Sequence, residues 1–387
     1  MKKLHIINLE KIGGVERMFL QYINNIDHKN DTVICIGSKI SKDISSNLKT
    51  KIIFSNRLFN NLPLRCPQFI RKFWLQWKIS KVSSEIIIIW DLIVKLYYKP
   101  KYSKIIYYDH GSSWRFTFNK KTIKFFSILD GVISVSNASK RVMELRFQIP
   151  CKHLVVHNGI KNPININMKN KLSLFPLRLG TASRLVHLKG ISVSLLTLYE
   201  LISRGHDVTM EIIGKGPQKK QLEILTQKLN LSEHVIFSPF QNELSNFFTR
   251  IDIYMSTPIT EAFGLSCLES LYHGVPVIFP LIDGQPEVIS NHVCGVGITP
   301  SVSVKEHEFI TGIRINYLNE VYNPLTDSLV KPKFLSHIDC ANAVEMLMVD
   351  ETYRQFSFNA QHYIREKFTF HIFEKKFQDA LSFFFKQ

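Results

Sequence analysis

The sequence predicts an α/β protein of two Rossmann-like domains, each with a parallel, doubly wound sheet. The chain has 387 residues, 45% of them apolar and 21% charged, a globular composition with enough length for two hydrophobic cores of roughly 150 to 200 residues each. Short apolar runs alternate with helix-length segments in both halves, the pattern of parallel strands joined by helices. A polar stretch with turn signals, residues 158–173, separates the halves. These observations exclude disordered and fibrous classes of protein.

The first half begins with an expected strand at residues 4–8, a turn at Gly13 and Gly14, and a helix at residues 15–26. Further strands are expected at residues 32–36, 51–55, 85–90, 105–108, 132–135 and 154–157. The second half repeats the alternation, with strands expected at residues 177–182, 209–213, 235–237, 253–255 and 275–279.

We therefore expect a first domain at residues 1–165 and a second at residues 166–365, with ligands bound in a cleft between the facing carboxyl ends of their strands. The last segment, residues 366–387, has a helical pattern and a Phe-rich end. Because these phenylalanines need a surface to pack on, we expect the segment to cross back onto the first domain. A helix packed on its own domain is the simpler alternative.

The cysteines and the apolar runs indicate in which cellular compartment the protein is found. No two of the six cysteines lie closer than the 27 residues between Cys267 and Cys294, which excludes a metal knuckle and a disulfide-dense scaffold. The N-terminal apolar run is interrupted by Glu10, and the most apolar stretch, residues 86–98, contains Asp91 and Lys95. A membrane-spanning helix needs about 20 apolar residues. We expect a cytoplasmic protein without such a helix.

The net charge of +17 is unevenly distributed. Residues 1–170 contain 29 Lys and Arg against 10 Asp and Glu, whereas the remaining residues contain 20 against 22. A codon bias toward lysine would act on both halves, so an anionic partner of the first half is the preferred explanation.

One basic segment has the pattern of an interfacial helix. In residues 67–81, aromatic residues share one helical face and basic residues flank it, which is typical of helices that lie on anionic lipid. The predicted membrane or acceptor face comprises Arg71, Lys72, Trp74, Trp77 and Lys78. The alternative is a core helix whose basic residues are merely solvated.

The most informative segment for chemistry is residues 258–278. Glu261 lies in a loop after an expected strand, Gly264 opens an expected helix, and Glu269 follows eight residues after Glu261. The free N–H groups and the positive dipole end of that helix would form a diphosphate-binding corner beside Glu261. The alternative is that the two glutamates only cap the helix and lie on its solvent-exposed face.

At these residues the chain resembles glycosyltransferase family 4, the retaining, nucleotide-sugar-dependent group 1 glycosyltransferases of GT-B fold. The spacing of Glu261 and Glu269 matches the family's pair of glutamates. The other matching motifs are Gly-Gly-Val-Glu at residues 13–16, His110 in YDHGSS, ISVSNASK at 133–140, VVHNGI at 155–160, GTASRLVHLKG at 180–190, IIGKGP at 212–217 and PEVI at 286–289.

The resemblance implies a role for each matching residue. Arg184 and Lys189 would hold the donor diphosphate, Glu261 would contact hydroxyls of the donor sugar, Glu269 would bind the ribose, and His110 would approach the transferred sugar. The implied catalytic residues are Glu261, His110, Arg184 and Lys189. The implied donor-binding residues are Gly13, Gly14, Arg184, Lys189, Gly214, Gly216, Pro217, Ala262, Phe263, Gly264, Leu265, Glu269 and Glu287.

The implied reaction is transfer of a sugar from a nucleotide diphosphate sugar with retention of configuration and without a metal. No Asp-x-Asp motif occurs, so Arg184, Lys189 and the helix N-terminus would replace a divalent cation at the leaving group. The expected acceptor is a saccharide or glycolipid of bacterial surface polysaccharide biosynthesis, such as lipopolysaccharide, reached from the inner face of the cytoplasmic membrane. Ala262 and Gln285 depart from the family pattern, which leaves the sugar open.

Three other functions are considered. Basic residues interleaved with aromatic ones also describe single-stranded nucleic-acid binding, although no RNA-recognition signature or zinc finger accompanies them and we expect no nucleic-acid partner. A nucleotide-sugar epimerase on the same architecture would act without an acceptor. A sugar-binding relative without activity is disfavoured because both glutamates, Arg184 and Lys189 are present.

Overall fold

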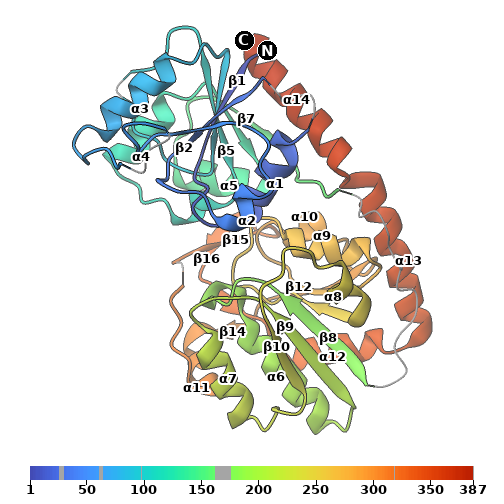
Figure 1. Cartoon of the computed structure of the whole chain (residues 1–387). Coiled ribbons are helices and arrows are strands. Elements are labelled where there is room, and N and C mark those ends of the chain that lie inside the picture. Colours follow the sequence, from blue (N-terminus) through green and yellow to red (C-terminus); the bar gives the residue numbers. More distant parts are fainter. Residues whose placement is uncertain (26–29, 61–63, 97, 162–175, 318, 387) are drawn as a thin grey trace. The chain divides into compact units, whose positions relative to one another are not determined.

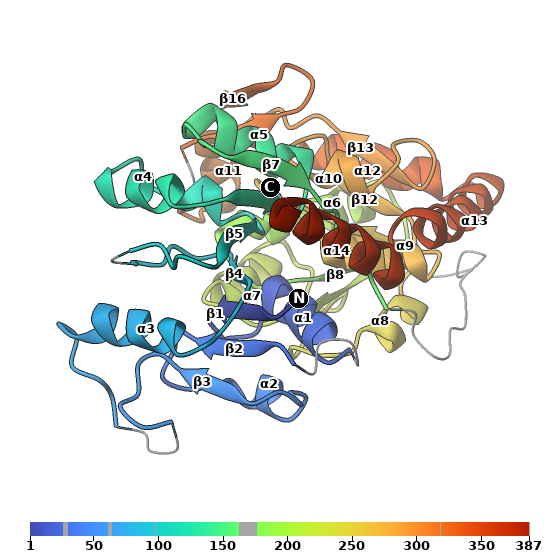
Figure 2. The same cartoon turned by 90° about the horizontal axis from the view of Figure 1, so that it is seen from above.

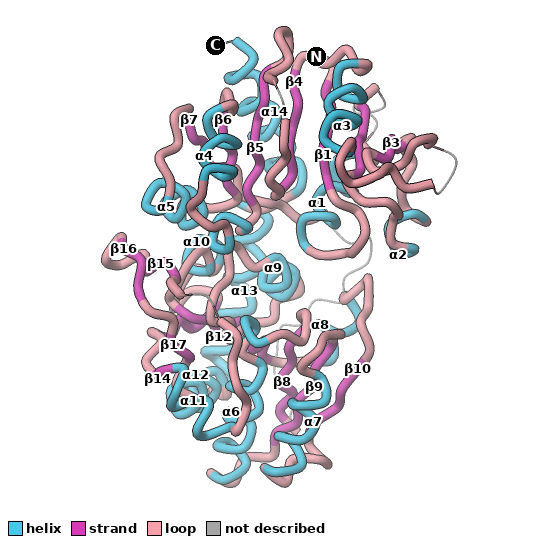
Figure 3. Tube along the Cα trace, turned by 90° about the vertical axis from the view of Figure 1, so that its left-hand side faces the viewer, coloured by secondary structure: helices cyan, strands magenta, loops and turns pink. Residues whose placement is uncertain are grey.

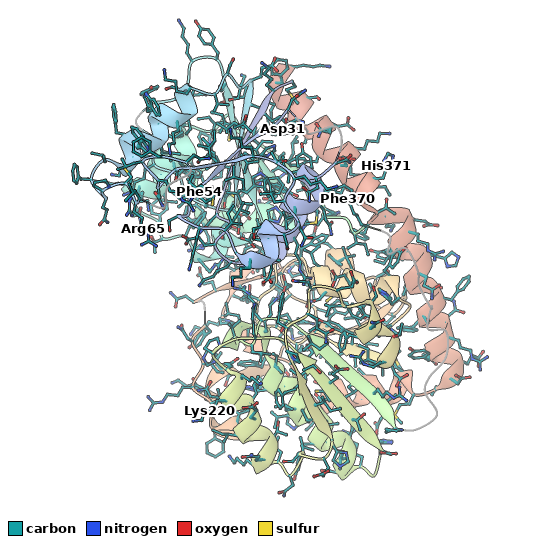
Figure 4. All side chains as sticks on the ribbon, in the orientation of Figure 1. Asp31, Phe54, Arg65, Lys220, Phe370 and His371 are labelled. Carbon is teal, nitrogen blue, oxygen red and sulfur yellow. The ribbon has the colours of Figure 1, made fainter. Side chains whose placement is uncertain are left out.

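The computed structural model describes residues 1–25, 30–60, 64–96, 98–161, 176–317 and 319–386 (Figure 1). The chain divides into two compact units, one of Met1–Lys161 with His371–Gln387 and one of Asn162–Phe370. Phe370 and His371, on either side of the second division, are labelled in Figure 4. Most of the linker predicted at residues 158–173, including the predicted boundary at 165/166, lies outside the described residues.

The first unit is built on a seven-stranded parallel sheet in the order β3-β2-β1-β4-β5-β6-β7. Its strands are β1 Lys3–Ile7, β2 Thr32–Cys35, β3 Ile52–Phe54, β4 Ile86–Trp90, β5 Lys104–Asp109, β6 Gly131–Ser134 and β7 Lys152–Val155. Figure 3 shows the strands from β7 to β1 side by side across this unit. Each strand overlaps one of the seven runs predicted for the first half.

Helices cover both faces of this sheet. They are α1 Gly14–Ile23, α2 Lys42–Ser45, α3 Arg71–Ser80, α4 Lys120–Ser127 and α5 Asn137–Arg146, with a 3₁₀ turn, η2, at Ser112–Arg115. Figure 2 shows α3 and α4 on one side of the sheet and α1 and the C-terminal helix α14, Phe370–Lys386, on the other. Successive strand residues point to opposite faces, so Tyr107 meets Phe125 of α4 while Tyr108 meets Phe377 of α14.

Helix α14 completes the core of the first unit, so the prediction that the C-terminal segment crosses back to it is confirmed. The Phe377 ring lies 5.3 Å from that of Tyr22 and 4.9 Å from that of Tyr108, between ring centroids. The Gln378 amide donates to the Tyr22 hydroxyl at 2.9 Å. A Cβ atom at Gly131 would lie 2.3 Å from the Phe384 ring, so β6 accepts this helix only because residue 131 has no side chain.

The second unit is built on a six-stranded parallel sheet in the order β10-β9-β8-β11-β12-β13. Its strands are β8 Leu177–Ala182, β9 Val208–Ile213, β10 Val235–Ser238, β11 Ile253–Met255, β12 Val277–Pro280 and β13 Gly295–Ile298. The helices are α6 Ile191–Ser203, α7 Lys219–Lys228, α8 Ser245–Arg250, α9 Leu265–Tyr272, α10 Gln285–Val288, α11 Val304–Thr311, α12 His337–Leu347 and α13 Asp350–Lys367, with a 3₁₀ turn, η3, at His187–Lys189. Two small antiparallel pairs, β14 Val302–Ser303 with β17 Lys333–Phe334 and β15 Val321–Asn323 with β16 Ser328–Val330, complete the unit.

The prediction of two parallel α/β domains is confirmed, but strand β13 is missing from it. This strand alternates glycine with apolar residues, a weak strand signal. The glycines are needed for packing, because a Cβ at Gly295 would lie 2.6 Å from the Val277 carbonyl and one at Gly297 would lie 2.4 Å from the Leu281 side chain.

No helix in the described ranges is long and apolar enough to span a bilayer.

The packing of α14 leads to a stability prediction. Phe377 is fully buried, so the Phe377→Ala variant is expected to lower the free energy of unfolding of the first unit by about 3 to 5 kcal/mol, the usual effect of truncating a buried phenylalanine. All four tryptophans, at positions 74, 77, 90 and 114, lie in this unit, so urea unfolding followed by tryptophan fluorescence measures it. The matched control is Phe385→Ala on the same helix, because Phe385 is 45% exposed. Equal losses in both variants would contradict this account of α14.

Candidate active site

The predicted donor-site residues of the second unit gather at one edge of its sheet. Because all six strands are parallel, their carboxyl ends lie at the same edge, where open α/β sheets bind ligands. Arg184 and Lys189 follow β8, Gly214 and Gly216 follow β9, and Glu261 lies in the loop between β11 and α9.

Lys189 and Glu261 form an ion pair between Nζ and Oε2. The Glu261 Oε1 atom also accepts from the backbone N–H of Phe263 at 3.4 Å. Burial by itself would raise the pKa of the Glu261 carboxyl, but the Lys189 charge and hydrogen bond, the Phe263 N–H and the more distant Arg184 charge outweigh it and lower that pKa. Glu261 is therefore a carboxylate at neutral pH, with positive charge at its side.

The backbone loops that carry this ion pair are fastened to each other. Gly190 ends η3 with a φ of 59°, and a Cβ there would lie 2.0 Å from the carbonyl oxygen of Thr257. The Thr257 hydroxyl donates to the Gly190 carbonyl at 2.9 Å, and the Ile259 N–H donates to the Leu188 carbonyl at 2.9 Å. The distance between Lys189 and Glu261 is thus set by backbone contacts and not by their flexible side chains alone.

A third loop, after β9, approaches the loop after β8 just as closely. A Cβ at Gly214 would lie 2.0 Å from the Ser183 carbonyl oxygen, and one at Gly216 would lie 2.2 Å from the Leu185 carbonyl oxygen. Gly214 and Gly216, with the exposed Pro217 beside them, therefore flank the exposed Arg184. This contact gives both glycines a structural role besides the predicted role in donor binding.

Helix α9 begins where the sequence predicts. Gly264 precedes it with a φ of 98°, which favours glycine, and a Cβ there would be 3.4 Å from both Cys267 Sγ and Gln285 Nε2. The first N–H groups of the helix have no partner within it, and Glu269 is one turn along. Of the neighbouring predicted residues, Phe263 is buried, while Ala262 and Leu265 are half-buried.

Two residues behind this helix start are absent from the sequence-based set. Asp283 accepts from the backbone N–H of Glu261 at 3.0 Å and from that of Tyr322 at 2.8 Å. The first of these bonds fixes the backbone of the Glu261 loop. Gln285 donates from Nε2 to Ser256 Oγ at 2.5 Å and to Cys267 Sγ at 3.3 Å. Its Oε1 atom is buried and has no hydrogen-bond partner in the described part of the chain. Glu287, which was predicted, lies two residues further on in α10 and is half-buried.

The other three predicted catalytic and donor-site residues belong to the first unit. His110 directly follows β5, and its ring lies 4.1 Å from that of Tyr108 and 5.7 Å from that of Trp90. Burial lowers the pKa of His110 to about 3, so the imidazole is neutral at pH 7. Its Nε2 atom is buried without a hydrogen-bond partner among the described residues.

Asp91, which the sequence analysis does not single out, positions the backbone at His110. Its Oδ1 atom accepts from the N–H groups of His110 at 2.8 Å and Ser112 at 3.0 Å, and its Oδ2 atom accepts from Ser112 Oγ at 2.7 Å. Burial, reinforced by the nearby Asp109 carboxylate, raises the pKa of Asp91 to about 7. The signal that points to it is an acidic residue directly after the apolar strand β4.

Gly13 and Gly14 lie where β1 leads into α1. Gly13 precedes the helix, its carbonyl accepts from the Arg17 N–H at 3.1 Å, and Gly14 is the first helical residue. A Cβ at Gly13 would lie 2.9 Å from Glu16 Oε2, so the Glu16 carboxylate lies beside this helix start.

On helix α3 the structure corrects one residue of the predicted membrane or acceptor face. Lys78 is only 8% exposed, and its ammonium donates to the carbonyl oxygens of Phe54 at 2.5 Å and Arg57 at 2.8 Å. The Lys78 side chain points inward because its ammonium satisfies one carbonyl group at the end of edge strand β3 and one in the loop after it. Lys72 and Trp77 are exposed, whereas Arg71 and Trp74 are half-buried and donate to the carbonyl oxygens of Cys66 and Arg57.

No group of three or more His, Cys, Asp or Glu side chains within the described ranges is arranged to hold a metal ion.

Comparison with known proteins shows similarity to glycosyltransferases. Residues 164–309 match the family described as glycosyl transferases group 1. An uncharacterized glycosyltransferase of Methanocaldococcus jannaschii is 29% identical over 185 residues, 44% of this chain and 47% of that protein. One of Haemophilus influenzae is 23% identical over 80% of this chain and 86% of its own. The O-antigen biosynthesis glycosyltransferase WclY of Escherichia coli is 32% identical over 26% of this chain and 27% of its own. The chain thus spans about half or less of several relatives it matches.

Solved structures show the same fold over nearly the whole chain. Anabaena HepE, solved in complex with UDP and glucose, has a TM-score of 0.72 at 16% identity and covers 99% of both chains. WaaG, a glycosyltransferase involved in lipopolysaccharide biosynthesis, has a TM-score of 0.66 at 15% identity and covers 97% of this chain and 98% of its own. The fold is therefore GT-B, as the sequence resemblance implied.

The raised pKa of Asp91 leads to a prediction about pH. Since the folded chain holds this proton up to about pH 7 and the unfolded chain only to about pH 3.8, protonation of Asp91 stabilises the first unit as the pH falls from 7 toward 4. The neutral His110 has the opposite effect below pH 6.5, so the comparison needs a variant. The unfolding free energy of the wild type, measured relative to that of Asp91→Asn, is expected to rise by up to about 1.4 kcal/mol for each unit by which the pH falls in this window.

Urea unfolding between pH 8 and pH 4.5, followed by tryptophan fluorescence, measures this difference. The exposed Asp379 provides the control Asp379→Asn, which is expected to follow the wild type at every pH. A constant difference between wild type and Asp91→Asn across the window would show that Asp91 has an ordinary pKa.

Proposed function

We propose that this chain, whose residues 164–309 match the glycosyl transferases group 1, transfers a glycosyl unit from a nucleotide diphosphate sugar to a saccharide or lipid-linked saccharide. The observation that carries the proposal is the cluster at the carboxyl edge of the second sheet. There the Lys189–Glu261 ion pair, the exposed Arg184 and the start of α9 lie on loops held together by close backbone contacts. Two cations and a helix N-terminus suit a diphosphate, and a carboxylate suits sugar hydroxyls.

The proposed division of labour follows from the charges. Arg184 offers a planar fork of donors and Lys189 a point charge, and together with the α9 N–H groups they stabilise the leaving diphosphate. Glu261 is ionised at neutral pH, so it accepts hydrogen bonds from hydroxyls of the donor sugar. Glu269, one turn into α9, is proposed to bind the ribose, whose two adjacent hydroxyls match two carboxylate oxygens.

We propose further that transfer retains the anomeric configuration and needs no metal. The leaving phosphate then accepts the proton of the acceptor hydroxyl, and the two cations neutralise the charge that develops on the diphosphate. His110 is proposed to contact the transferred sugar, a role supported by its neutral ring and its buried, unpartnered Nε2 atom.

The proposed acceptor is a glycan of bacterial surface polysaccharide biosynthesis, of the lipopolysaccharide type. Support comes from the O-antigen enzyme WclY among the relatives and from WaaG among the structures of like fold. We also propose that the chain works at the inner face of the cytoplasmic membrane and that α3 lies against anionic lipid. On this helix Phe73 is 63% exposed and Trp77 is 42% exposed, with the exposed Lys72 beside them.

Donor binding gives the first test. Arg184→Ala and Lys189→Ala are each expected to weaken binding of the cognate nucleotide diphosphate sugar about tenfold or more, because each removes a charge-assisted hydrogen bond to the diphosphate. Calorimetric titration with a panel of UDP-, GDP- and ADP-sugars measures the affinity. Lys220→Ala is the charge-matched control, since Lys220 lies on α7 with its side chain in solvent (Figure 4).

The same preparations distinguish the alternatives. Hydrolysis or transfer that persists in EDTA supports the metal-free mechanism, whereas complete loss in EDTA would contradict it. Equal affinity in the Arg184→Ala and Lys220→Ala variants would remove the diphosphate site from Arg184. Failure to bind any donor, together with tight binding of an oligonucleotide, would replace the transferase proposal by nucleic-acid binding.

Membrane association gives the second test. The double variant Phe73→Ser and Trp77→Ser is expected to bind vesicles of 70% phosphatidylcholine and 30% phosphatidylglycerol about tenfold more weakly, because it removes two apolar side chains that would enter the lipid interface. Co-sedimentation measures the bound fraction. Phe309→Ser is the control, since Phe309 is exposed on α11 of the other unit. Wild-type binding that is equally strong to pure phosphatidylcholine in high salt would contradict an anionic lipid partner.

A further inference from the structure

We propose that a lysine-lined pocket in the first unit binds a phosphate or diphosphate group, at a site separate from the donor diphosphate. The pocket has a cavity volume of about 320 Å³. Five lysines line it: Lys72, Lys95, Lys120, Lys121 and Lys124. We call it the five-lysine pocket.

Three segments that are distant in the sequence build this pocket. Lys72 comes from the first turn of α3, Lys95 from the loop that follows β4, and the other three from α4. Figure 2 shows α3 and α4 on the same side of the sheet, which agrees with the shared lining. Since only the folded chain brings these lysines to one hollow, the cluster is a property of the tertiary structure and not of a basic stretch.

The charge in the pocket is uncompensated. Neither α3 nor α4 contains an acidic residue, and in the described part of the chain none of the five lysines forms an ion pair with a carboxylate. The positive charges of Lys72 and Lys121 lower the pKa of Lys95, which shows that these ammonium groups repel one another. An anion between them would remove that repulsion.

The position of the lysines on α4 also gains nothing for folding. Lys120 and Lys121 occupy the first turn, where the helix dipole favours negative charge. Asn119 caps this helix by accepting from the N–H groups of Lys121 at 3.0 Å and Thr122 at 3.1 Å. The cap satisfies these N–H groups, and the side chains of Lys120 and Lys121 line the pocket.

The floor of the pocket is apolar, which strengthens the attraction between the lysines and an anion. Leu96 and Phe125 are buried beneath the exposed lysines. Apolar walls exclude water and concentrate the field of the charges around them. Five cations suit a group with two or more negative charges, and each ammonium offers three donors to phosphate oxygens. Phe125 is the aromatic ring among the described lining residues and it is buried, so these residues offer no exposed ring on which a nucleotide base would stack.

One segment of the pocket begins at the predicted catalytic edge of the first sheet. The loop with Lys95 leaves the carboxyl end of β4, and His110 follows the neighbouring strand β5. Resting on the proposed transferase function, the inference therefore assigns the acceptor a chemical class: a saccharide that carries a phosphate or diphosphate group, which this pocket holds.

The test counts pyrophosphate sites on the full chain. Calorimetric titration with pyrophosphate at low salt is expected to give two sites per chain in the wild type. Lys95→Gln with Lys121→Gln is expected to leave one, Arg184→Ala is expected to leave the other, and the combined variant is expected to leave neither. The control is Lys375→Gln with Lys376→Gln, an equal charge change at exposed residues on the far side of the same unit (Figure 1). All five side chains of the pocket are exposed, so the substitutions remove no buried contact.

The outcomes separate this inference from the function on which it rests. One site that is lost in the Lys95 and Lys121 variant but kept in Arg184→Ala supports the pocket and contradicts the donor site. One site with the opposite behaviour, or an equal loss of pyrophosphate affinity in the Lys375 and Lys376 control, overturns the pocket.

Vesicles distinguish the source of the phosphate. If the ligand belongs to a lipid, the Lys95 and Lys121 variant is expected to bind vesicles of 80% phosphatidylcholine and 20% phosphatidic acid at least fivefold more weakly than the control variant does. If vesicle binding is unchanged while pyrophosphate binding is lost, the pocket takes the phosphate of a soluble acceptor. Tighter binding of an oligonucleotide than of pyrophosphate, lost in the same variant, would overturn the phosphate assignment in favour of a nucleic acid.

Discussion

Close approach between backbone loops at the carboxyl edge of the second sheet is the constraint on which the candidate donor site depends. Gly190 touches the carbonyl of Thr257, and Gly214 and Gly216 touch the loop after β8. A Cβ at these positions would lie 2.0 to 2.2 Å from a carbonyl oxygen, well inside van der Waals contact, so any side chain there would push the loops apart. Three loops from three strands therefore act as one platform, and the ion pair between Lys189 and Glu261 is a consequence of that platform.

The first unit uses a different device, an aromatic cluster. The His110 ring packs on Tyr108 and Trp90, and these two rings in turn pack on Phe377 of α14. The imidazole is thus held from one side by rings and from the backbone side by Asp91. Burial in this cluster is also what keeps the ring neutral, so the same contacts set the position of His110 and its protonation state.

The alternation of apolar runs and helices was sufficient to predict both sheets, because buried parallel strands are apolar along their whole length. It was insufficient for β13, whose glycines are needed for close packing and weaken the strand signal. Motif spacing likewise predicted Glu261, Arg184 and Lys189, which come together in space. It did not predict Asp283, because its partners are backbone groups on loops far away in the sequence. The family pattern marked Gln285 as a departure, but not its buried partners Ser256 and Cys267.

Lys78 illustrates a limit of helical periodicity. Helical spacing places this residue beside Trp74 and Trp77, and the pattern alone does not tell whether a flanking lysine meets solvent or protein. Edge strand β3 and the loop after it offer two carbonyl oxygens to the Lys78 ammonium. A lysine side chain is long enough for its ammonium to reach carbonyl groups at a sheet edge and be buried there. The position of Lys78 is therefore decided by the edge of the sheet, which the amphipathic pattern does not reveal.

The position of α14 has a consequence for synthesis on the ribosome. Residues 1–161 contain every strand of the first sheet, yet the helix that covers Tyr22, Tyr108 and Gly131 is translated only after residue 370. At about 5 to 20 residues per second, roughly 10 to 40 seconds separate the two segments. During that time one aromatic face of the nascent first unit is bare. The unit that is made first is therefore the last to be completed.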